Sequence, residues 1–156
     1  MRPGFLELGK IKFHCWLKGG HGSTNVTEAI AASCDCFFYE AARRAGVDRI
    51  SDMATRLGFG RQSELGLPGE STGNQPTRAW KQEKVGKPWQ HGDTFNLGIG
   101  QGYMTSTPLQ LAIMTARIAN GGYEVQPNLL LAKATPREEL GPPPLVTKPA
   151  APSLRL

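Results

Sequence analysis

Residues 92–121 read GDTFNLGIGQGYMTSTPLQLAIMTARIANG, and this segment says more about the fold than any other. Its first half places Gly98, Gly100 and Gly102 in an apolar, strand-like run over 93–103. Because each glycine weakens a plain strand, the run indicates backbone that lies close to another part of the protein. Its Gly-x-Gly-x-Gly spacing, with no acidic residue at the expected distance, differs from the dinucleotide-binding fingerprint and argues against nucleotide binding.

The second half predicts a helix over 108–119. Thr107 can cap the first turn, Pro108 suits the first helical position, and Asn120-Gly121 can end the helix. Outward from this helix, the pattern predicts a strand at 11–13, helices over 25–32, 35–45 and 47–57, a loop over 58–92 and a strand that can begin at 123. The first of those helices has a capping-box spacing between Asn25 and Glu28.

Composition and charge narrow the class of protein. The 156 residues are 39% hydrophobic and 20% charged, with a net charge of +5, as in ordinary globular proteins. The basic residues are scattered and form no basic helix with interleaved aromatics, so we expect no nucleic-acid partner. No apolar run reaches the ~18 residues of a membrane span, and no signal peptide pattern is present. Taken alone, the chain is expected to stay in the cytoplasm.

The chain divides into a globular part, 1–131, and a proline-rich segment, 132–156, which is typical of disordered or polyproline-like chain. The globular part predicts several helices and almost no sheet for their apolar faces to cover. We therefore interpret it as part of a larger α/β domain, with the helical portion present and the sheet largely missing.

Two groups of residues could carry chemistry. Ser33 and Asp35 lie at a junction between predicted helices, where they could hydrogen-bond a substrate or orient a proton carrier, but helix capping alone would explain both and is the favoured interpretation. Cys15, His21 and Cys34 offer zinc ligands. Their spacing is weaker than that of a zinc ribbon, so on the residues alone a buried free thiol or a Cys15–Cys34 disulfide is favoured over zinc.

A third candidate is His91, which could act as a base. It has no serine or cysteine partner in a strained turn, so a surface histidine is the favoured interpretation. The odd number of cysteines, three, excludes a fully paired disulfide framework within one chain. Cys34 and Cys36 are expected on one helix with their side chains on different faces, which disfavours a bridge between them.

From about Pro3 to about Pro127, the sequence resembles the transpeptidase domain of class B penicillin-binding proteins, most of all the elongation type, penicillin-binding protein 2. The matching pieces keep the family's order and spacing. They are His14-Cys15-Trp16, Gly20-His21-Gly22, the run 33–39 (SCDCFFY), Gly46-Val47-Asp48-Arg49-Ile50, Gly58-Phe59-Gly60, Gly73-Asn74, Pro76-Thr77, Trp80-Lys81, Trp89 and 92–121.

The resemblance implies a β-lactamase-like serine acyltransferase fold, with a central antiparallel sheet flanked by helices. It also implies an active site built from three motifs, Ser-x-x-Lys, Ser-x-Asn or Ser-x-Asp, and Lys-Thr-Gly. The family's serine attacks a D-alanyl-D-alanine stem peptide, and β-lactams trap the same serine. Ser33 and Asp35 match the middle motif. By resemblance, Ser33 would hydrogen-bond the family's lysine and relay a proton, and Asp35 would contact substrate.

The other two motifs do not occur in these 156 residues. No serine is followed three residues later by lysine, and there is no Lys-Thr-Gly. We therefore expect this polypeptide to be inactive by itself and interpret it as a truncated or frame-shifted reading frame.

The resemblance also bears on the cysteines. Some elongation-type members carry zinc beside the active site, with ligands at the positions of Cys15, His21 and Cys34 and a fourth ligand further upstream. Cys15 stands where other members have aspartate, and both residue types bind zinc. The three ligands present would then form an incomplete site.

The resulting hypothesis is a fragment of a peptidoglycan D,D-transpeptidase that cross-links stem peptides during cell-wall elongation. The resemblance implies stem peptides, β-lactams and cell-elongation membrane proteins as partners, at the periplasmic face of the inner membrane. One alternative is a non-catalytic remnant or scaffold with the same partial fold. Another is a β-lactamase or β-lactam sensor relative, which the residues around His21 and Trp80 disfavour.

Overall fold

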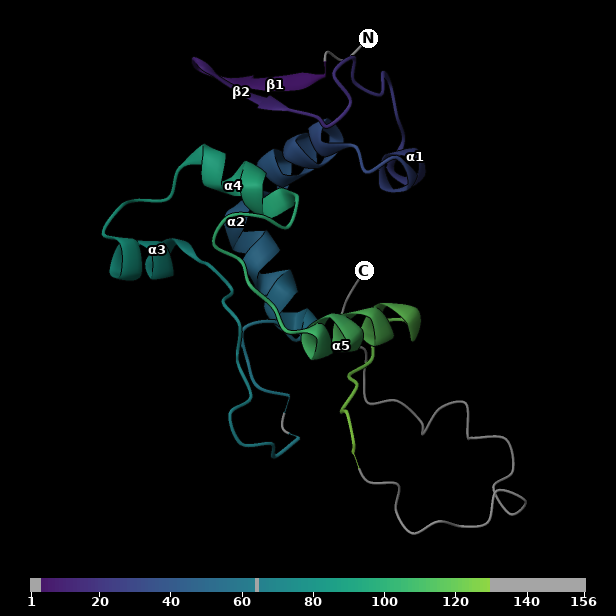
Figure 1. Cartoon of the computed structure of the whole chain (residues 1–156), viewed down its shortest axis with the longest axis vertical. Coiled ribbons are helices and arrows are strands. Elements are labelled where there is room, and N and C mark those ends of the chain that lie inside the picture. The colour runs from purple at the N-terminus through teal and green to yellow at the C-terminus, as the bar shows by residue number, and fades with distance from the viewer. Residues whose placement is uncertain (1–3, 64, 130–156) are drawn as a thin grey trace, which may run out of the picture. The chain divides into compact units, whose positions relative to one another are not determined.

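The computed structural model describes residues 4–63 and 65–129 (Figure 1). The described residues form two strands and five helices. These are β1 (Phe5–Leu8), β2 (Ile11–His14), α1 (Val26–Ala31), α2 (Asp35–Leu57), α3 (Arg78–Val85), α4 (His91–Gly98) and α5 (Pro108–Ala119). They belong to two compact units, one of residues up to Met53 together with Gln75–Met104, the other of Ala54–Asn74 together with the residues from Thr105 onward.

The strands of the first unit form an antiparallel hairpin in which Phe5 pairs with His14 and Leu8 with Ile11 (Figure 1). The turn between them contains Gly9, whose φ of 61° lies in the left-handed region that glycine adopts at little cost. The strand predicted at 11–13 is thus confirmed. Its partner, β1, carries no sequence signal that we recognised.

A capping box marks the start of α1, and a glycine marks a kink in α2. Asn25 accepts from the backbone of Glu28 at 2.9 Å, and the Glu28 carboxylate accepts from the backbone of Asn25 at 2.9 Å, which confirms the predicted capping box. The helices predicted on either side of Gly46 are a single element, α2, that is kinked there. Gly46 has φ 77° and ψ 156°, a non-helical conformation, so the predicted break appears as a kink.

The strand-like run predicted over 93–103 was wrong: α4 covers it through Gly98, and residues 99–103 form no strand. The carboxylate of Asp93 accepts from the backbone N–H of Gln90 at 2.7 Å and begins the helix. The predicted close approach does occur. A Cβ on Gly98 would lie 2.4 Å from the Cβ of Ala42 in α2, so only glycine lets the two helices pack at this distance.

The core of the first unit is aromatic. Phe95 of α4 is fully buried, and its ring meets the ring of Phe13 edge-on at 4.9 Å between centroids. Tyr39 of α2 lies 5.8 Å from each of these rings and donates a hydrogen bond to the carbonyl of His14 at 3.2 Å. This cluster therefore joins β2, α2 and α4.

The loop predicted over 58–92 was wrong in its second half, which contains α3. Thr77 caps this helix, its hydroxyl accepting from the backbone of Trp80 at 3.0 Å, and Gly86 ends it in the left-handed conformation. Both signals are readable in the sequence, but the eight-residue helix is too polar to show a periodic apolar face. Lys81, which is buried, pairs with Asp93 and so ties α3 to α4.

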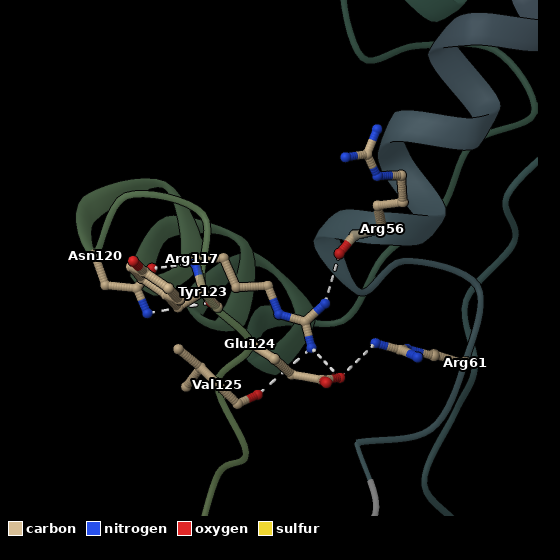
Figure 2. A network of polar contacts seen from close by, with 7 residues as sticks. All are labelled: Arg56, Arg61, Arg117, Asn120, Tyr123, Glu124 and Val125. Atoms are coloured by element: carbon tan, nitrogen blue, oxygen red, sulfur yellow. Dashed lines mark hydrogen bonds and ion pairs between the residues drawn. The ribbon is translucent and has the colours of Figure 1, made fainter. Parts of the chain in front are cut away.

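In the second unit, α5 has the predicted bounds and the predicted Thr107 cap. The buried amide of Gln110 donates to the carbonyls of Arg61 and Thr72, each at 2.8 Å, and so fastens the preceding loop to α5. Arg117 extends from the far end of α5 to the segment at 123–125 and to the end of α2 (Figure 2). The strand expected to begin at 123 does not form.

The architecture agrees with the expected partial transpeptidase fold, since the regular secondary structure of the described residues is mainly helical and includes only a two-stranded sheet. The proline-rich segment expected over 132–156 lies outside the described residues. Among the residues described, no helix is both long and apolar enough to cross a membrane.

Candidate functional site

Cys15, His21 and Cys34 come together in the first unit. Each offers one metal-ligand atom, and the three atoms all lie within 4.8 Å of one another. The Cys15 sulfur is 3.5 Å from Nδ1 of His21. Both cysteines are buried and His21 is half-buried, so the cluster lies under the surface with its imidazole on the outer side.

Backbone hydrogen bonds position the two thiols. Cys15 immediately follows β2, and its N–H donates to the carbonyl of Gly4 at 2.8 Å. A side chain at Gly4 would meet the carbonyl of Lys18 at 2.3 Å, so glycine is required where this turn closes. Cys34 follows α1 and donates its N–H to the carbonyl of Ala29 at 2.9 Å.

The donor set fits a zinc ion. A tetrahedral zinc with Zn–S near 2.3 Å and Zn–N near 2.0 Å would separate a sulfur and a nitrogen ligand by about 3.6 Å. The 3.5 Å between Cys15 and His21 is close to that edge length. Two thiols and an imidazole are also ligand types that zinc prefers to oxygen donors in structural sites.

A third thiol, that of Cys36, belongs to the same buried cluster. It lies within hydrogen-bonding reach of Cys15, and burial, followed by the neighbouring Cys15 and Cys34 thiols, raises its pKa to about 11. The expectation that Cys34 and Cys36 share one helix was wrong, because α2 begins at Asp35. None of the three cysteines takes part in a disulfide, so the Cys15–Cys34 bridge is not formed.

Ser33 and Asp35 are positioned by Trp16. The Trp16 indole N–H donates to the carbonyl of Ser33 at 3.0 Å, and the Trp16 backbone N–H donates to the Asp35 carboxylate at 3.0 Å. Ser33 has a φ of 48°, in the region that non-glycine residues rarely adopt. Such backbone conformations concentrate at functional sites, where the surrounding contacts hold them.

These contacts do not support the capping interpretation, because the hydrogen bond that the Asp35 carboxylate accepts comes from Trp16 and not from the first turn of α2. Instead, both residues line a pocket of ≈ 310 Å³. The rest of its wall is apolar and comes from Ile30, Phe38, Gly98 and Ile99. The segment 98–99 of the opening stretch thus lies beside the Ser33-x-Asp35 motif.

Two features of the site carried no sequence signal that we used. The sequence marks Trp16 only as part of a family motif, although its side chain joins the thiol–imidazole cluster to the Ser33–Asp35 turn; its ring centroid lies 5.3 Å from that of His21. Cys36 was expected to point away from Cys34. By contrast, His91 is exposed at the start of α4, as the surface interpretation predicts.

Comparison with known proteins decides the family. The family model for the penicillin binding protein transpeptidase domain matches residues 5–153. The chain belongs to this transpeptidase family. The match runs into the proline-rich segment, beyond the limit near Pro127 that the residue motifs give.

Individual relatives of this transpeptidase chain agree. Peptidoglycan D,D-transpeptidase MrdA of Escherichia coli is 41% identical over 134 residues, which cover 85% of this chain and 21% of the relative. Among solved structures, Pseudomonas aeruginosa PBP2 in complex with WCK 5153 has a TM-score of 0.77 at 41% identity, over 81% of this chain and 29% of the other. The complex between PBP2 and MreC from Helicobacter pylori has a TM-score of 0.78 at 36% identity, over 86% and 25%.

The transpeptidase chain thus spans about a fifth of the length of the curated relatives it matches. What is similar is therefore only a part of each of these relatives.

Proposed function

We propose that this chain supplies one wall of the active site of a peptidoglycan D,D-transpeptidase. The observation that carries the proposal is that Ser33 and Asp35 line the same pocket. It is supported by the 41% identity to MrdA over 85% of the chain. In this function, Ser33 hydrogen-bonds the family's catalytic lysine and helps to move a proton. Asp35, oriented by the Trp16 N–H, contacts the stem peptide.

The proposed partners follow from the relatives. The substrate class is a D-alanyl-D-alanine stem peptide, and β-lactams are the corresponding inhibitors. The MreC complex of the Helicobacter pylori relative supports a cell-elongation membrane protein as a partner. We accordingly propose the periplasmic face of the inner membrane as the place of action of the whole enzyme.

A second candidate is a non-catalytic remnant. Residues 1–156 by themselves contain neither Ser-x-x-Lys nor Lys-Thr-Gly. Without a serine nucleophile beside a lysine, no acyl-enzyme can form, and at best residual binding is left.

A segment exchange separates the two candidates. Residues 5–129 replace the matching segment of the Escherichia coli relative, which supplies the other two motifs, and labelling by a fluorescent penicillin is measured. We expect the exchanged enzyme to be labelled, and Ser33→Ala within it to slow labelling by about 10²–10⁴-fold because a proton relay is lost.

Two controls accompany this exchange. The 156-residue chain alone is expected to stay unlabelled, and Ser23→Ala, at an exposed position outside the pocket, is expected to leave labelling unchanged. A folded exchange product that takes up no penicillin would favour the remnant.

We further propose that Cys15, His21 and Cys34 hold zinc. The support is the mutual proximity of their ligand atoms and the burial of both sulfurs. When bound, zinc would supply a structural cross-link and no bond-making chemistry. Fixing these ligands would also fix the active-site motif, because Cys15 directly precedes Trp16 and Cys34 lies between Ser33 and Asp35. A fixed cluster therefore holds the turn that carries the active-site motif.

Metal content tests the zinc proposal. We expect Cys34→Ala to lower the zinc affinity of the full chain by at least about 100-fold, since losing a direct ligand should cost no less than losing a supporting residue. Zinc is measured by elemental analysis and by competition with a chelator. Ala29→Gly alters the same buried cluster without removing a donor and should keep its zinc. Equal zinc content in the Cys34→Ala chain would refute the assignment.

A further inference from the structure

The second unit contains a small cavity between the loop that follows α2, helix α5 and the segment at 124–127. Its volume is ≈ 30 Å³, and Arg61, Ser63, Arg117 and Glu124 are among the residues that line it. A cavity of this size has room for about two water molecules, or for one ion or chemical group of similar size. It is far from any role that the transpeptidase motifs assign, so its wall has to be interpreted from its own chemistry.

Two buried polar atoms of the wall have no hydrogen-bond partner among the described residues. They are Nε of Arg117 and Oγ of Ser63. Arg117 is 4% exposed, and its terminal nitrogens already donate elsewhere (Figure 2). One donates to the carbonyl of Arg56 at 2.6 Å and the other to the carboxylate of Glu124 at 3.3 Å. Because buried donors without an acceptor are costly, the cavity offers two hydrogen bonds to whatever enters it.

The charges of the wall favour an anion. Two guanidinium groups, those of Arg61 and Arg117, line the cavity, and both lean on the single carboxylate of Glu124, at 3.4 Å and 3.3 Å. A second carboxylate, Glu70, accepts from the backbone N–H of Ser63 at 2.6 Å and is not among the lining residues. Burial, and after it the like charge of Arg61, lower the pKa of Arg117, and Glu124 opposes them to a smaller degree.

We propose that this cavity binds one small monovalent anion, either a chloride ion or a single carboxylate group. The Nε–H of Arg117 and the hydroxyl of Ser63 donate to it, and Arg61 adds positive charge. Hydrogen bonds of this charge-assisted kind are the strong ones. Water would satisfy the two donors but would not offset the second guanidinium. The bound anion ties the loop after α2 to the last turn of α5, independently of the transpeptidase function.

Replacement of one anion by another tests the site on the full 156-residue chain. Sodium chloride or sodium formate replaces sodium gluconate at constant ionic strength, since the gluconate ion is too large for the cavity. Line broadening in the chloride NMR spectrum and the urea midpoint followed by circular dichroism are measured. We expect saturable broadening that formate competes away, and a midpoint that rises with either anion, because a ligand that binds only the folded state stabilises it.

Ser63→Ala separates anion binding from a structural role. Its hydroxyl has no partner among the described residues, so in gluconate its removal should leave the urea midpoint unchanged or slightly higher. In chloride the variant lacks one charge-assisted hydrogen bond, and we expect its affinity for chloride to be at least about 10-fold weaker. Ser106→Ala is the matched control, at an exposed position of the same unit outside the lining residues, and should respond to chloride as the wild type does.

Each outcome decides the inference. A response to both anions supports a general site for small monovalent anions. A response to formate alone assigns the site to a carboxylate group, and a response to chloride alone assigns it to a halide. If neither anion raises the midpoint above its value in gluconate, the cavity holds only water and the inference is overturned. A wild-type chloride response in Ser63→Ala would overturn it as well.

Discussion

Phe95→Ala is expected to destabilise the first unit by about 3–5 kcal/mol, the usual cost of deleting a fully buried aromatic ring. The ring has no exposed surface, and its edge-on contact with Phe13 and its neighbour Tyr39 join α4 to β2 and α2. Urea unfolding followed by tryptophan fluorescence measures the loss, because Trp16, Trp80 and Trp89 all belong to the first unit.

The same variant should also weaken zinc binding, because β2 leads directly to Cys15. Ile113→Ala is the matched control. Ile113 is buried in the second unit, so its truncation should destabilise that unit and leave the zinc affinity as it is. If Phe95→Ala lowered stability without any change in zinc affinity, the aromatic cluster would not be what positions the thiols.

Arg117→Met is expected to lower the free energy of unfolding by about 2–4 kcal/mol, because it removes a buried guanidinium and leaves its hydrogen-bond acceptors without a donor. Arg117 is 4% exposed and donates to the carbonyl of Arg56 at 2.6 Å and to the Glu124 carboxylate at 3.3 Å (Figure 2). Burial lowers the pKa of its guanidinium, because the charged form has lost hydration. The hydrogen bonds to Arg56 and Glu124 partly replace that hydration. Urea unfolding followed by circular dichroism measures the effect, since the second unit has no tryptophan.

Two further variants interpret that result. Arg61 also contacts Glu124, at 3.4 Å, but its side chain is 50% exposed, so Arg61→Met should change stability by less than about 0.5 kcal/mol. Arg117→Lys keeps the charge but lacks the planar fork that reaches two acceptors. Its loss of stability should therefore lie between those of Arg61→Met and Arg117→Met. Similar losses in Arg117→Met and Arg61→Met would contradict a special role for the buried guanidinium.

Several elements could be predicted because their signals are local. The Asn25 capping box, the kink at Gly46 and the Thr107 cap each depend on residues within one or two turns of the element. The errors have a physical reason too. Helix α3 is short and polar, and α4 contains the glycines that we took for a strand, so in neither is the hydrophobic period readable. Contacts with other elements, such as the Lys81–Asp93 pair and the Gly98–Ala42 approach, stabilise them instead.

For the candidate site, the sequence named the donors and the motif but left their alternatives open. On the residues alone, a helix cap is favoured over catalysis for Ser33 and Asp35, and a free thiol or a disulfide is favoured over zinc for Cys15 and Cys34. The Trp16 hydrogen bonds and the proximity of His21 to both thiols bear on those choices. Neither could be derived from spacing, because the groups involved lie 6–19 residues apart in the chain.

The sequence by itself determined the family, through short motifs in a fixed order, and most helix boundaries, through caps and glycines that act over a few residues. Tertiary structure alone decided what the glycine-rich stretch at 92–121 does. Gly98 sits at the end of a helix packed on α2 and lines the pocket beside Ser33 and Asp35. It also decided that the three cysteines lie in one buried cluster, with half-buried His21 beside Cys15 and Cys34. The physical reason is that such groupings depend on long-range packing of aromatic and apolar side chains, for which the order of residues along the chain gives no distance.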